Sequence, residues 1–265
     1  MLAKMNAKET VLITGASSGI GLELARCFAA DGSRLVLVAR NKDALDALAE
    51  ELRQKNKIEV IILPADLSLP EAPRQIFDTL AARKVAVDVL VNNAGFGLHG
   101  KFLEMPLARQ LEIIKVNVNA LVELTGLFLP EMRQRRAGGI LNVGSVAGFV
   151  PGPNLAIYYA SKAFVQSFSE ALASELESTG VSVTVLCPGP TETNFGTVAS
   201  GQKKRVAQTR KMTARDVAQI GHKAFRAKKV ISVPGLSNKA LIMATRITPR
   251  SVVRRIINKY NTFKD

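Results

Sequence analysis

The feature that most constrains this chain is the alternation of short apolar runs with longer segments of helical periodicity. Seven runs rich in β-branched residues occur at 10–14, 34–39, 59–63, 87–92, 138–145, 181–187 and 229–233. Their apolar character is nearly continuous, which indicates strands buried on both faces of a sheet. Strands that alternate with helices pair in parallel through right-handed crossovers. The sequence therefore predicts a doubly wound α/β fold with helices on both faces of the sheet.

Length and composition favour one domain. The 265 residues are 47% hydrophobic, enough for one sizeable core, and we expect a single domain over residues 1–265. The first residues lack the pattern of a cleaved leader, and no apolar run approaches bilayer length, so we expect a cytoplasmic protein. Residues 194–212 have no strong pattern, and a loop of that length is usually a lid or a binding loop. We expect it to be the substrate loop.

A glycine-rich stretch, TGASSGIG at 14–21, follows the first strand and opens the first helix. Backbone N–H groups and the helix dipole can hold a pyrophosphate at this place. Gly15 permits the tight turn, while Gly19 and Gly21 allow close approach of the ligand and of helix to strand. A plain turn is the alternative, but the position favours a dinucleotide. We expect the contacts to come from Gly15, Ser17, Ser18, Gly19 and Ile20.

The end of the second strand distinguishes the two nicotinamide cofactors. An acidic residue there binds the ribose 2′-hydroxyl and repels a 2′-phosphate. This strand ends in VLVARN, so the acid is missing and Arg40 follows Ala39. A guanidinium is a planar, multi-donor partner for phosphate. The sequence therefore predicts NADP(H) rather than NAD(H), with Arg40 bound to the 2′-phosphate.

Four motifs in order resemble the short-chain dehydrogenase/reductase family, in its compact branch. They are TGASSGIG at 14–21, NNAG at 92–95, the set Ser145, Tyr158 and Lys162, and PGPTET at 188–193. The resemblance extends from about residue 10 to residue 233. It implies a Rossmann fold with a seven-stranded parallel sheet in the order 3-2-1-4-5-6-7. It also implies an oxidoreductase that transfers hydride between a nicotinamide and a carbonyl or alcohol.

The same resemblance assigns further cofactor contacts. Asp66 and Leu67, after the third strand, are expected to hold the adenine. Asn93, Ala94 and Gly95 are expected to line the cofactor. The nicotinamide carboxamide is expected to be seated by Pro188, Gly189, Thr191 and Thr193.

Residues 158–162, YYASK, contain two candidates for the catalytic tyrosine. The family motif is Tyr-x-x-x-Lys, and Tyr158 stands four residues before Lys162, whereas Tyr159 stands three before it. Residues at i and i+4 share a helix face. A nearby ammonium group favours the phenolate, so we expect the Tyr158 pKa to be lowered and Tyr158 to be the general acid/base. Tyr159 is expected to pack on a helix or line the cleft.

The resemblance gives three more residues a role. Ser145 is expected to hydrogen-bond the substrate carbonyl and stabilise the charge that develops there. Lys162 is also expected to bind the nicotinamide ribose, and Tyr158 is likewise expected to contact the cofactor. Asn117 matches the helix asparagine that holds a water linking the lysine to solvent, and Asn119 is its rival. His99, His222, Cys27 and Cys187 lack metal-ligand spacing, so no metal site is expected, although His99 could border the cleft.

The positive charge lies in one part of the chain. The net charge is +14, yet residues 201–265 hold 17 Lys and Arg against two acids, while residues 1–200 hold 19 against 20. Within this segment QKKRVAQTRK at 202–211 falls in the predicted substrate loop. It could attract an acidic carrier, such as CoA or an acyl carrier protein, and reduction of a 3-oxoacyl thioester would suit that partner.

Residues 235–265 form a basic C-terminal extension with near-helical apolar spacing, which Pro249 should divide into two helices. A solvated basic face is the simplest interpretation. The helices could also cover the active-site mouth, pack on another subunit, or lie on an anionic membrane surface.

A second class of function is an NADP(H)-binding sensor whose basic segment contacts nucleic acid or a membrane. Sensors of this superfamily tend to lack the Tyr-x-x-x-Lys pair, which is present here. Aromatic residues are sparse in the basic segment, so nucleic acid is an unfavoured partner. The family's usual pairing through its fourth and fifth helices predicts a homodimer or homotetramer. The substrate stays open among lipid-like ketones, acyl thioesters, steroids and small diketones.

Overall fold

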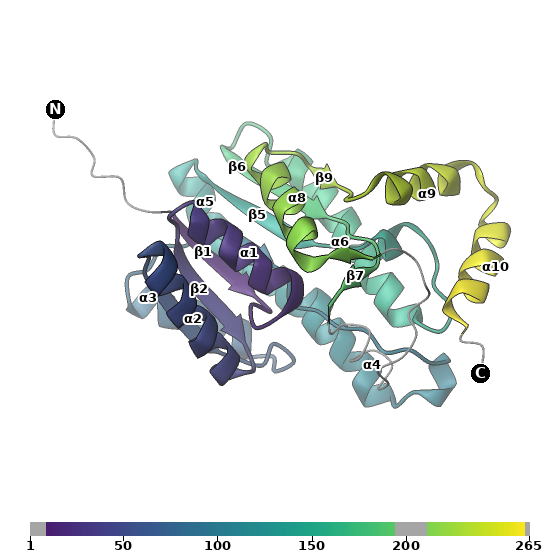
Figure 1. The fold of residues 1–265 in the computed structure, drawn as a ribbon, viewed down its shortest axis with the longest axis horizontal. Coiled ribbons are helices and arrows are strands. Elements are labelled where there is room, and N and C mark those ends of the chain that lie inside the picture. The colour runs from purple at the N-terminus through teal and green to yellow at the C-terminus, as the bar shows by residue number, and fades with distance from the viewer. Residues whose placement is uncertain (1–8, 194–210, 263–265) are drawn as a thin grey trace.

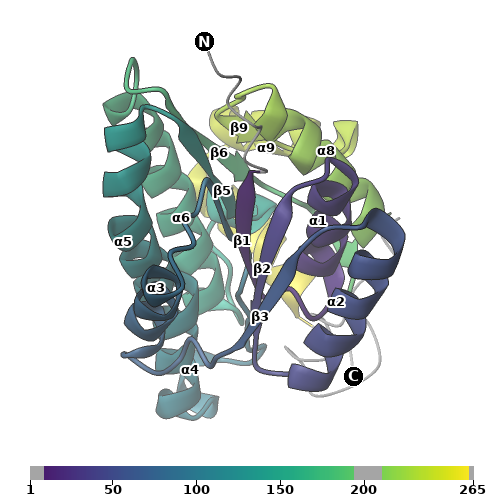
Figure 2. The ribbon, with the colours of Figure 1, turned by 90° about the vertical axis from the view of Figure 1, so that its left-hand side faces the viewer.

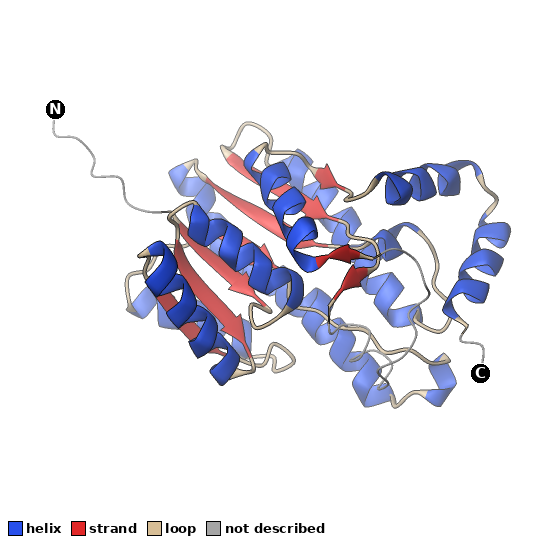
Figure 3. Cartoon of the chain, viewed as in Figure 1, coloured by secondary structure: helices blue, strands red, loops and turns tan. Residues whose placement is uncertain are grey.

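A seven-stranded parallel sheet forms the centre of the molecule (Figures 1 and 3). The computed structural model describes residues 9–193 and 211–262. The strands are β1 (Thr10–Thr14), β2 (Arg34–Ala39), β3 (Val60–Pro64), β4 (Val89–Asn92), β5 (Gly138–Val143), β6 (Val181–Leu186) and β9 (Ile231–Ser232). Their order is β3-β2-β1-β4-β5-β6-β9, and all pairs are parallel. The predicted order is confirmed, with β9 as the seventh strand.

Helices cover both faces of the sheet, as Figure 2 shows. One layer contains α1 (Gly19–Ala30), α2 (Lys42–Asn56) and α8 (Ala214–Arg226), and the other contains α3 (Ala72–Ala82), α5 (Ala120–Arg135) and α6 (Ala156–Glu175). Successive strand residues point to opposite faces. Val11 and Ile13 accordingly pack with the first layer and Leu12 with the second, and all three are fully buried. This explains why the strands read as continuous apolar runs.

The structure departs from the sequence expectations at several strand ends. The run at 138–145 leaves the sheet after Val143, and the run at 229–233 contributes only Ile231 and Ser232. A second, two-stranded sheet pairs β7 (Thr191–Glu192) with β8 (Met212–Thr213). Met212 is therefore a strand residue and not part of the expected 194–212 loop. Residues 194–210 lie outside the described part of the chain.

A long helical segment connects β4 and β5. It consists of the 3₁₀ turn η1 (Phe102–Glu104), α4 (Leu107–Ile114), the π-helical turn η2 (Lys115–Asn119) and α5. Residues 107–135 form the one described helix that is long and apolar enough to cross a membrane by length and composition. Core helices pass the same test, and Leu124, Phe128 and Met132 of this one are buried in the core.

The chain beyond β9 forms α9 (Leu236–Ile247) and α10 (Arg250–Asn261), with Thr248 and Pro249 between them. Figure 1 shows both helices at one end of the molecule, beyond the edge of the sheet. Most of their side chains are exposed, while Ile242, Val253 and Asn261 are buried.

Candidate active site

A cavity of about 920 Å³ lies beyond the carboxyl ends of the central strands. This is where open parallel sheets bind ligands. With the exception of Asn117, the residues expected from the sequence to contact cofactor or substrate line it: Gly15, Ser17, Ser18, Gly19, Ile20, Arg40, Asp66, Leu67, Asn93, Ala94, Gly95, Ser145, Tyr158, Lys162, Pro188, Gly189, Thr191 and Thr193. The 3₁₀ turn η3 (Val146–Phe149) contributes Val146 and Ala147 to the same wall.

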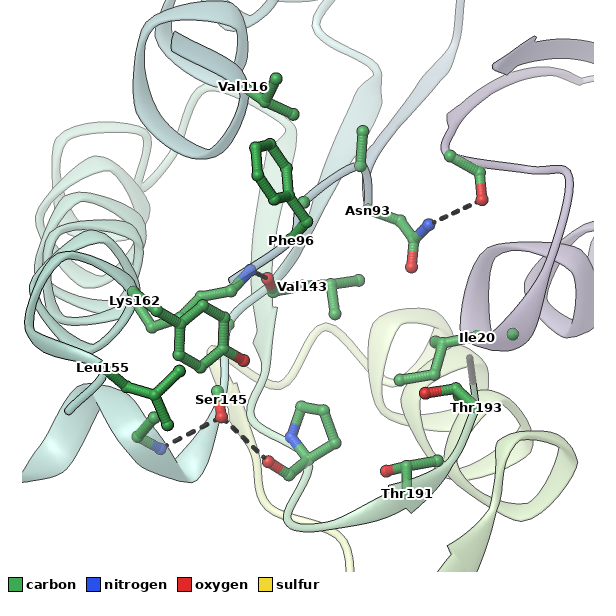
Figure 4. A pocket seen from close by; sticks show the side chains of 18 of the residues that line it. Ile20, Asn93, Phe96, Val116, Val143, Ser145, Leu155, Lys162, Thr191 and Thr193 are labelled. Atoms are coloured by element: carbon green, nitrogen blue, oxygen red, sulfur yellow. Dashed lines mark hydrogen bonds between the residues drawn. The ribbon is translucent and has the colours of Figure 1, made fainter. Parts of the chain in front are cut away.

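The glycine turn is braced from behind by the NNAG segment. Asn93 Nδ2 donates to the carbonyl oxygens of Thr14 and Gly15 at 2.9 and 3.1 Å. Thr14 Oγ1 accepts the backbone N–H groups of Asn93 and Ala94, each at 3.0 Å. The Asn93 amide nitrogen thus holds the turn in place, as Figure 4 shows. The expected contact of Asn93 with the cofactor therefore has to come from its other atoms.

The turn has no room for larger residues. Gly15 has a φ of 65°, and a Cβ at Gly21 would lie 2.3 Å from Asn93 Nδ2. The helix α1 begins at Gly19, and its first N–H groups have no partner within the helix. These features fit the pyrophosphate of a dinucleotide, because backbone donors can approach the phosphate oxygens without obstruction from side chains.

Arg40 and Asp66 lie at the ends of neighbouring strands. Arg40 Nη1 is 4.0 Å from Asp66 Oδ2, and the arginine side chain is 74% exposed. Burial acts to raise the pKa of Asp66, but hydrogen bonds from Ser68 and the charges of Arg40 and Arg109 lower it overall. The Arg40 guanidinium is therefore accessible to solvent at the cavity rim, and its ion pair with Asp66 is not buried.

Ser145 and Tyr158, the residues predicted to be catalytic, lie at one end of the cavity, which is called the reactive end below. Ser145 Oγ accepts the backbone N–H of Ala147 at 3.1 Å and donates to the Pro188 carbonyl at 3.4 Å. Tyr158 is half-buried by its accessible surface, and protein atoms surround its side chain closely. This burial raises the pKa of Tyr158 to about 12, and a hydrogen bond with Ser145 opposes the rise.

Lys162 is buried at the same end. Its Nζ donates to the Val143 carbonyl at 2.8 Å and lies 6.0 Å from the centroid of the Tyr158 ring. Burial lowers the pKa of Lys162 to about 8. The expectation that this lysine lowers the pKa of Tyr158 is wrong for the chain by itself. Desolvation of the phenol is the largest influence on the Tyr158 pKa. The Lys162 ammonium group donates to the Val143 carbonyl and not to the Tyr158 hydroxyl.

Asn117 lies behind the cavity wall in the π-helical turn. It is 1% exposed, donates to the Phe96 carbonyl and to Ser161 Oγ, both at 3.0 Å, and accepts the Phe96 N–H at 3.1 Å. A Cβ at Gly95 would lie 3.0 Å from Asn117 Oδ1 and 3.4 Å from Lys162 Nζ. Asn117 is thus near the lysine, whereas its rival Asn119 is exposed.

The PGPTET segment runs from Pro188, which is hydrogen-bonded to Ser145, to Thr191 and Thr193 across the cavity. Thr191 Oγ1 donates to the Gly189 carbonyl at 2.9 Å, and a Cβ at Gly19 would lie 3.1 Å from Thr193 Cγ2. Figure 4 shows Ile20, Thr191 and Thr193 across the pocket from Lys162 and Leu155. The glycine turn and the Tyr158–Lys162 pair therefore lie at different ends of the cavity.

Several lining residues were not identified from the sequence. They come mainly from the C-terminal helices: Asn238 and Leu241 of α9, and Ile256, Ile257, Tyr260 and Asn261 of α10. The amphipathic spacing predicted helices at 235–265, but it did not indicate which face of α9 or α10 lines the cavity. His99 and Tyr159 also line the wall, in agreement with their expected positions at the cleft.

A doubly wound sheet, a glycine turn at its first strand and a Ser-Tyr-Lys set in one cavity define a dinucleotide-dependent oxidoreductase as the class. The family model for short chain dehydrogenase matches residues 9–204. This chain belongs to the short-chain dehydrogenase family, whose oxidoreductases use a nicotinamide cofactor and act on alcohol or carbonyl groups.

Three similar proteins illustrate the range of the family. Sulfoacetaldehyde reductase 2 of Chromohalobacter salexigens is 39% identical over 80% of this chain and 86% of that protein. A very-long-chain 3-oxoacyl-CoA reductase of Laccaria bicolor is 38% identical over 69% of this chain, which spans 55% of that protein. A short-chain dehydrogenase from Sphingobium yanoikuyae, solved with NADPH, has a TM-score of 0.80 and 36% identity, covering 90% of this chain and 94% of that one.

Proposed function

We propose that this protein is an NADPH-dependent reductase of carbonyl compounds. The observation that carries the proposal is the convergence of Ser145, Tyr158 and Lys162 in the cavity that also contains the glycine turn. A nicotinamide dinucleotide bound there supplies or accepts the hydride. The remaining chemistry belongs to residues of the chain.

Cofactor binding is assigned to residues along the length of the cavity. The glycine turn and the start of α1 suit the pyrophosphate, Asp66 and Leu67 suit the adenine, and Lys162 suits the nicotinamide ribose. Arg40 supports a preference for NADPH, because its exposed guanidinium stands where an acid would select NADH. The Sphingobium yanoikuyae relative, bound to NADPH, is consistent with this choice.

Proton transfer is assigned to Tyr158. Its raised pKa of about 12 keeps the hydroxyl protonated at neutral pH, so it can donate to a carbonyl oxygen that becomes an alkoxide. Ser145 Oγ can exchange its weak bond with the Pro188 carbonyl for one to the same substrate oxygen. Lys162, with a pKa lowered to about 8, keeps a positive charge close to this oxygen below that pH.

The walls of the cavity favour a carbonyl compound with an apolar substituent. The apolar lining of the cavity includes Val150, Leu155, Leu241, Ile256 and Ile257. A lipid-like ketone or a 3-oxoacyl thioester fits this surface, and the Laccaria bicolor relative is named for the latter type of substrate. The basic stretch at 202–211 would attract the acidic CoA or carrier protein.

The C-terminal helices suit an anionic membrane surface. Leu236, Met243 and Ile247 of α9 are exposed, at 82%, 59% and 88%, beside basic residues. Exposed apolar and cationic side chains together favour binding at a lipid interface. We propose a cytoplasmic enzyme that meets such surfaces peripherally. Flotation with vesicles that contain phosphatidylserine, absent with neutral vesicles, is expected, and failure to float with either would refute it.

We also propose that the enzyme forms a homodimer or homotetramer. The long 107–135 helix and α6 correspond to the family's fourth and fifth helices, and Val122 and Phe164 are exposed on them. Light scattering at micromolar concentration tests this, since a monomer mass would exclude the pairing.

The test of the main proposal is fluorescence titration with NADPH and NADH, followed by turnover of diacetyl, propiophenone, a steroid ketone and acetoacetyl-CoA. We expect tighter binding of NADPH and reduction of at least one carbonyl. Tyr158→Phe should retain NADPH binding and lower kcat by about 10²–10⁴-fold, the usual contribution of a general acid. Equal affinity for the two cofactors would contradict the role of Arg40. Binding without turnover across the panel would favour the sensor function.

A further inference from the structure

Asn261 is a buried amide in an otherwise exposed helix. It is the penultimate described residue and 6% exposed, while its neighbours Lys259, Tyr260 and Thr262 are exposed. Burial of an amide is favourable only when its polar atoms have partners. The partners of Asn261 therefore indicate what holds this end of α10 against the rest of the molecule.

Three separate segments of the chain bind this one residue. Asn261 Oδ1 accepts from the Tyr159 hydroxyl at 3.3 Å, and Nδ2 donates to the Pro153 carbonyl at 2.9 Å. The main-chain carbonyl of Asn261 bonds His99 Nε2 at 2.6 Å, which requires the proton on that nitrogen. The amide thus joins α10 to the strand-end loop of His99, the loop before α6, and α6 itself.

The anchored helix forms part of the cavity wall. Ile256, Ile257 and Tyr260 line the cavity together with Asn261. The anchor partner Tyr159 is adjacent to Tyr158, with ring centroids 6.0 Å apart. The wall formed by α10 is therefore held directly beside the proposed proton donor.

Among the described residues α10 has few other anchors, one of them the bond from Asn154 Nδ2 to Thr262 Oγ1, at 3.4 Å, just after its end. Of its twelve residues, only Val253 and Asn261 are buried. An isolated helix of this length is marginal in water and depends on tertiary contacts for its position. Asn261 makes two side-chain hydrogen bonds and one main-chain hydrogen bond at the end of α10 farthest from α9, and these fix that end to the rest of the chain.

We propose that Asn261 is a specificity-determining positioning residue that fastens α10 so that Ile256, Ile257 and Tyr260 hold an apolar substituent of the carbonyl substrate. This inference rests on the proposed reductase function for its kinetic consequence. Its structural part concerns the free protein and is independent of that function.

The first measurement is hydrogen–deuterium exchange of residues 250–262 in the protein without cofactor. Asn261→Ala should increase exchange in this segment by about tenfold, the factor expected for the loss of one to two hydrogen bonds. The matched control is Asn258→Ala, the same change at an exposed position of the same helix, which should leave exchange unchanged. Equal exchange in Asn261→Ala and wild type would overturn the proposal.

The second measurement compares kcat/KM for the bulkiest and the smallest ketone of the panel that the enzyme reduces. Asn261→Ala should lower the value for the bulky ketone by about tenfold relative to the small one, since only the bulky ketone reaches α10. Equal losses for both, or a gain for the bulky ketone, would overturn the role in specificity.

A conservative variant covers the case in which Asn261→Ala fails to fold. Tyr159→Phe removes only the hydroxyl that donates to Asn261 and should change exchange and selectivity in the same direction by a smaller factor. No change in either property would overturn the proposal. A wild-type protein that binds no NADPH and reduces no ketone would refute the proposed function, whereas the exchange experiment would still decide the anchor.

Discussion

Lys162 and Tyr158 show how burial sets the protonation of the two groups at the reactive end. Desolvation penalises the charged form of each, so it lowers the pKa of the lysine to about 8 and raises that of the tyrosine to about 12. At neutral pH the phenol is therefore protonated and the ammonium is charged. That combination suits donation of a proton to a carbonyl, and it is less suited to abstraction of one from an alcohol.

The pH dependence of reduction follows from these directions. The Lys162 pKa is lowered from 10.5 to about 8, so its positive charge is present below that value and lost above it. We expect kcat/KM for ketone reduction, which reports the free enzyme, to fall above about pH 8. Lys162→Arg should remove this fall even though activity is lower, because the guanidinium stays charged. A wild-type profile without an inflection on the alkaline side would contradict the assignment.

The helical segment between β4 and β5 places Asn117 by a local irregularity. The π-helical turn η2 interrupts the α-helix at Lys115–Asn119, and such turns often occur at functional sites. Asn117 at its centre binds both backbone groups of Phe96 and the Ser161 hydroxyl. The turn therefore connects the strand-end loop with α6, which carries Tyr158 and Lys162.

Loss of Asn117 should destabilise this connection. Asn117→Ala removes three hydrogen bonds, a buried one to Ser161 and two part-buried ones to the Phe96 backbone, and we expect the free energy of unfolding in urea to fall by about 2 kcal/mol or more. Asn119→Ala, in the same turn but exposed, should change it by less than about 0.5 kcal/mol. Equal effects of the two substitutions would show that the buried hydrogen bonds of Asn117 contribute little.

The positive charge of the molecule is concentrated in its last 65 residues, away in the sequence from the glycine turn and the Ser145, Tyr158 and Lys162 set. The first 200 residues are nearly neutral, and the excess of positive charge lies in residues 201–265, which include the C-terminal helices. Among the described residues, the six cations of α9 and α10, from Lys239 to Lys259, form no ion pair with an acid. Their charge is therefore free to act on an external partner.

Charge reversal tests the acidic carrier. The triple variant Lys203→Glu, Lys204→Glu and Arg205→Glu changes positions outside the described residues, within the basic stretch identified from the sequence. We expect KM for acetoacetyl-CoA to rise by roughly tenfold at low salt and KM for diacetyl to stay the same, because only the first substrate is anionic. The difference should shrink in high salt. Equal changes in both KM values would exclude the carrier.

The amino-acid sequence by itself determined the alternation of strands and helices, the position of the glycine turn, and the motifs whose family resemblance implied the strand order. Each of these depends on local periodicity or on spacing within a few residues, such as the continuous apolar runs and the four-residue step from Tyr158 to Lys162. The choice of Tyr158 over Tyr159 rests on the same spacing and stays a prediction until the variants are measured.

The tertiary structure decided what depends on contacts between distant segments. The direction of the Tyr158 pKa shift follows from desolvation by surrounding elements, and the burial of Asn117 follows from its bonds to Phe96 and Ser161. The α10 wall depends on a bond between His99 and Asn261, 162 residues apart in the chain. Helical spacing could predict that α10 forms, but its place at the cavity arises from partners that no local pattern encodes.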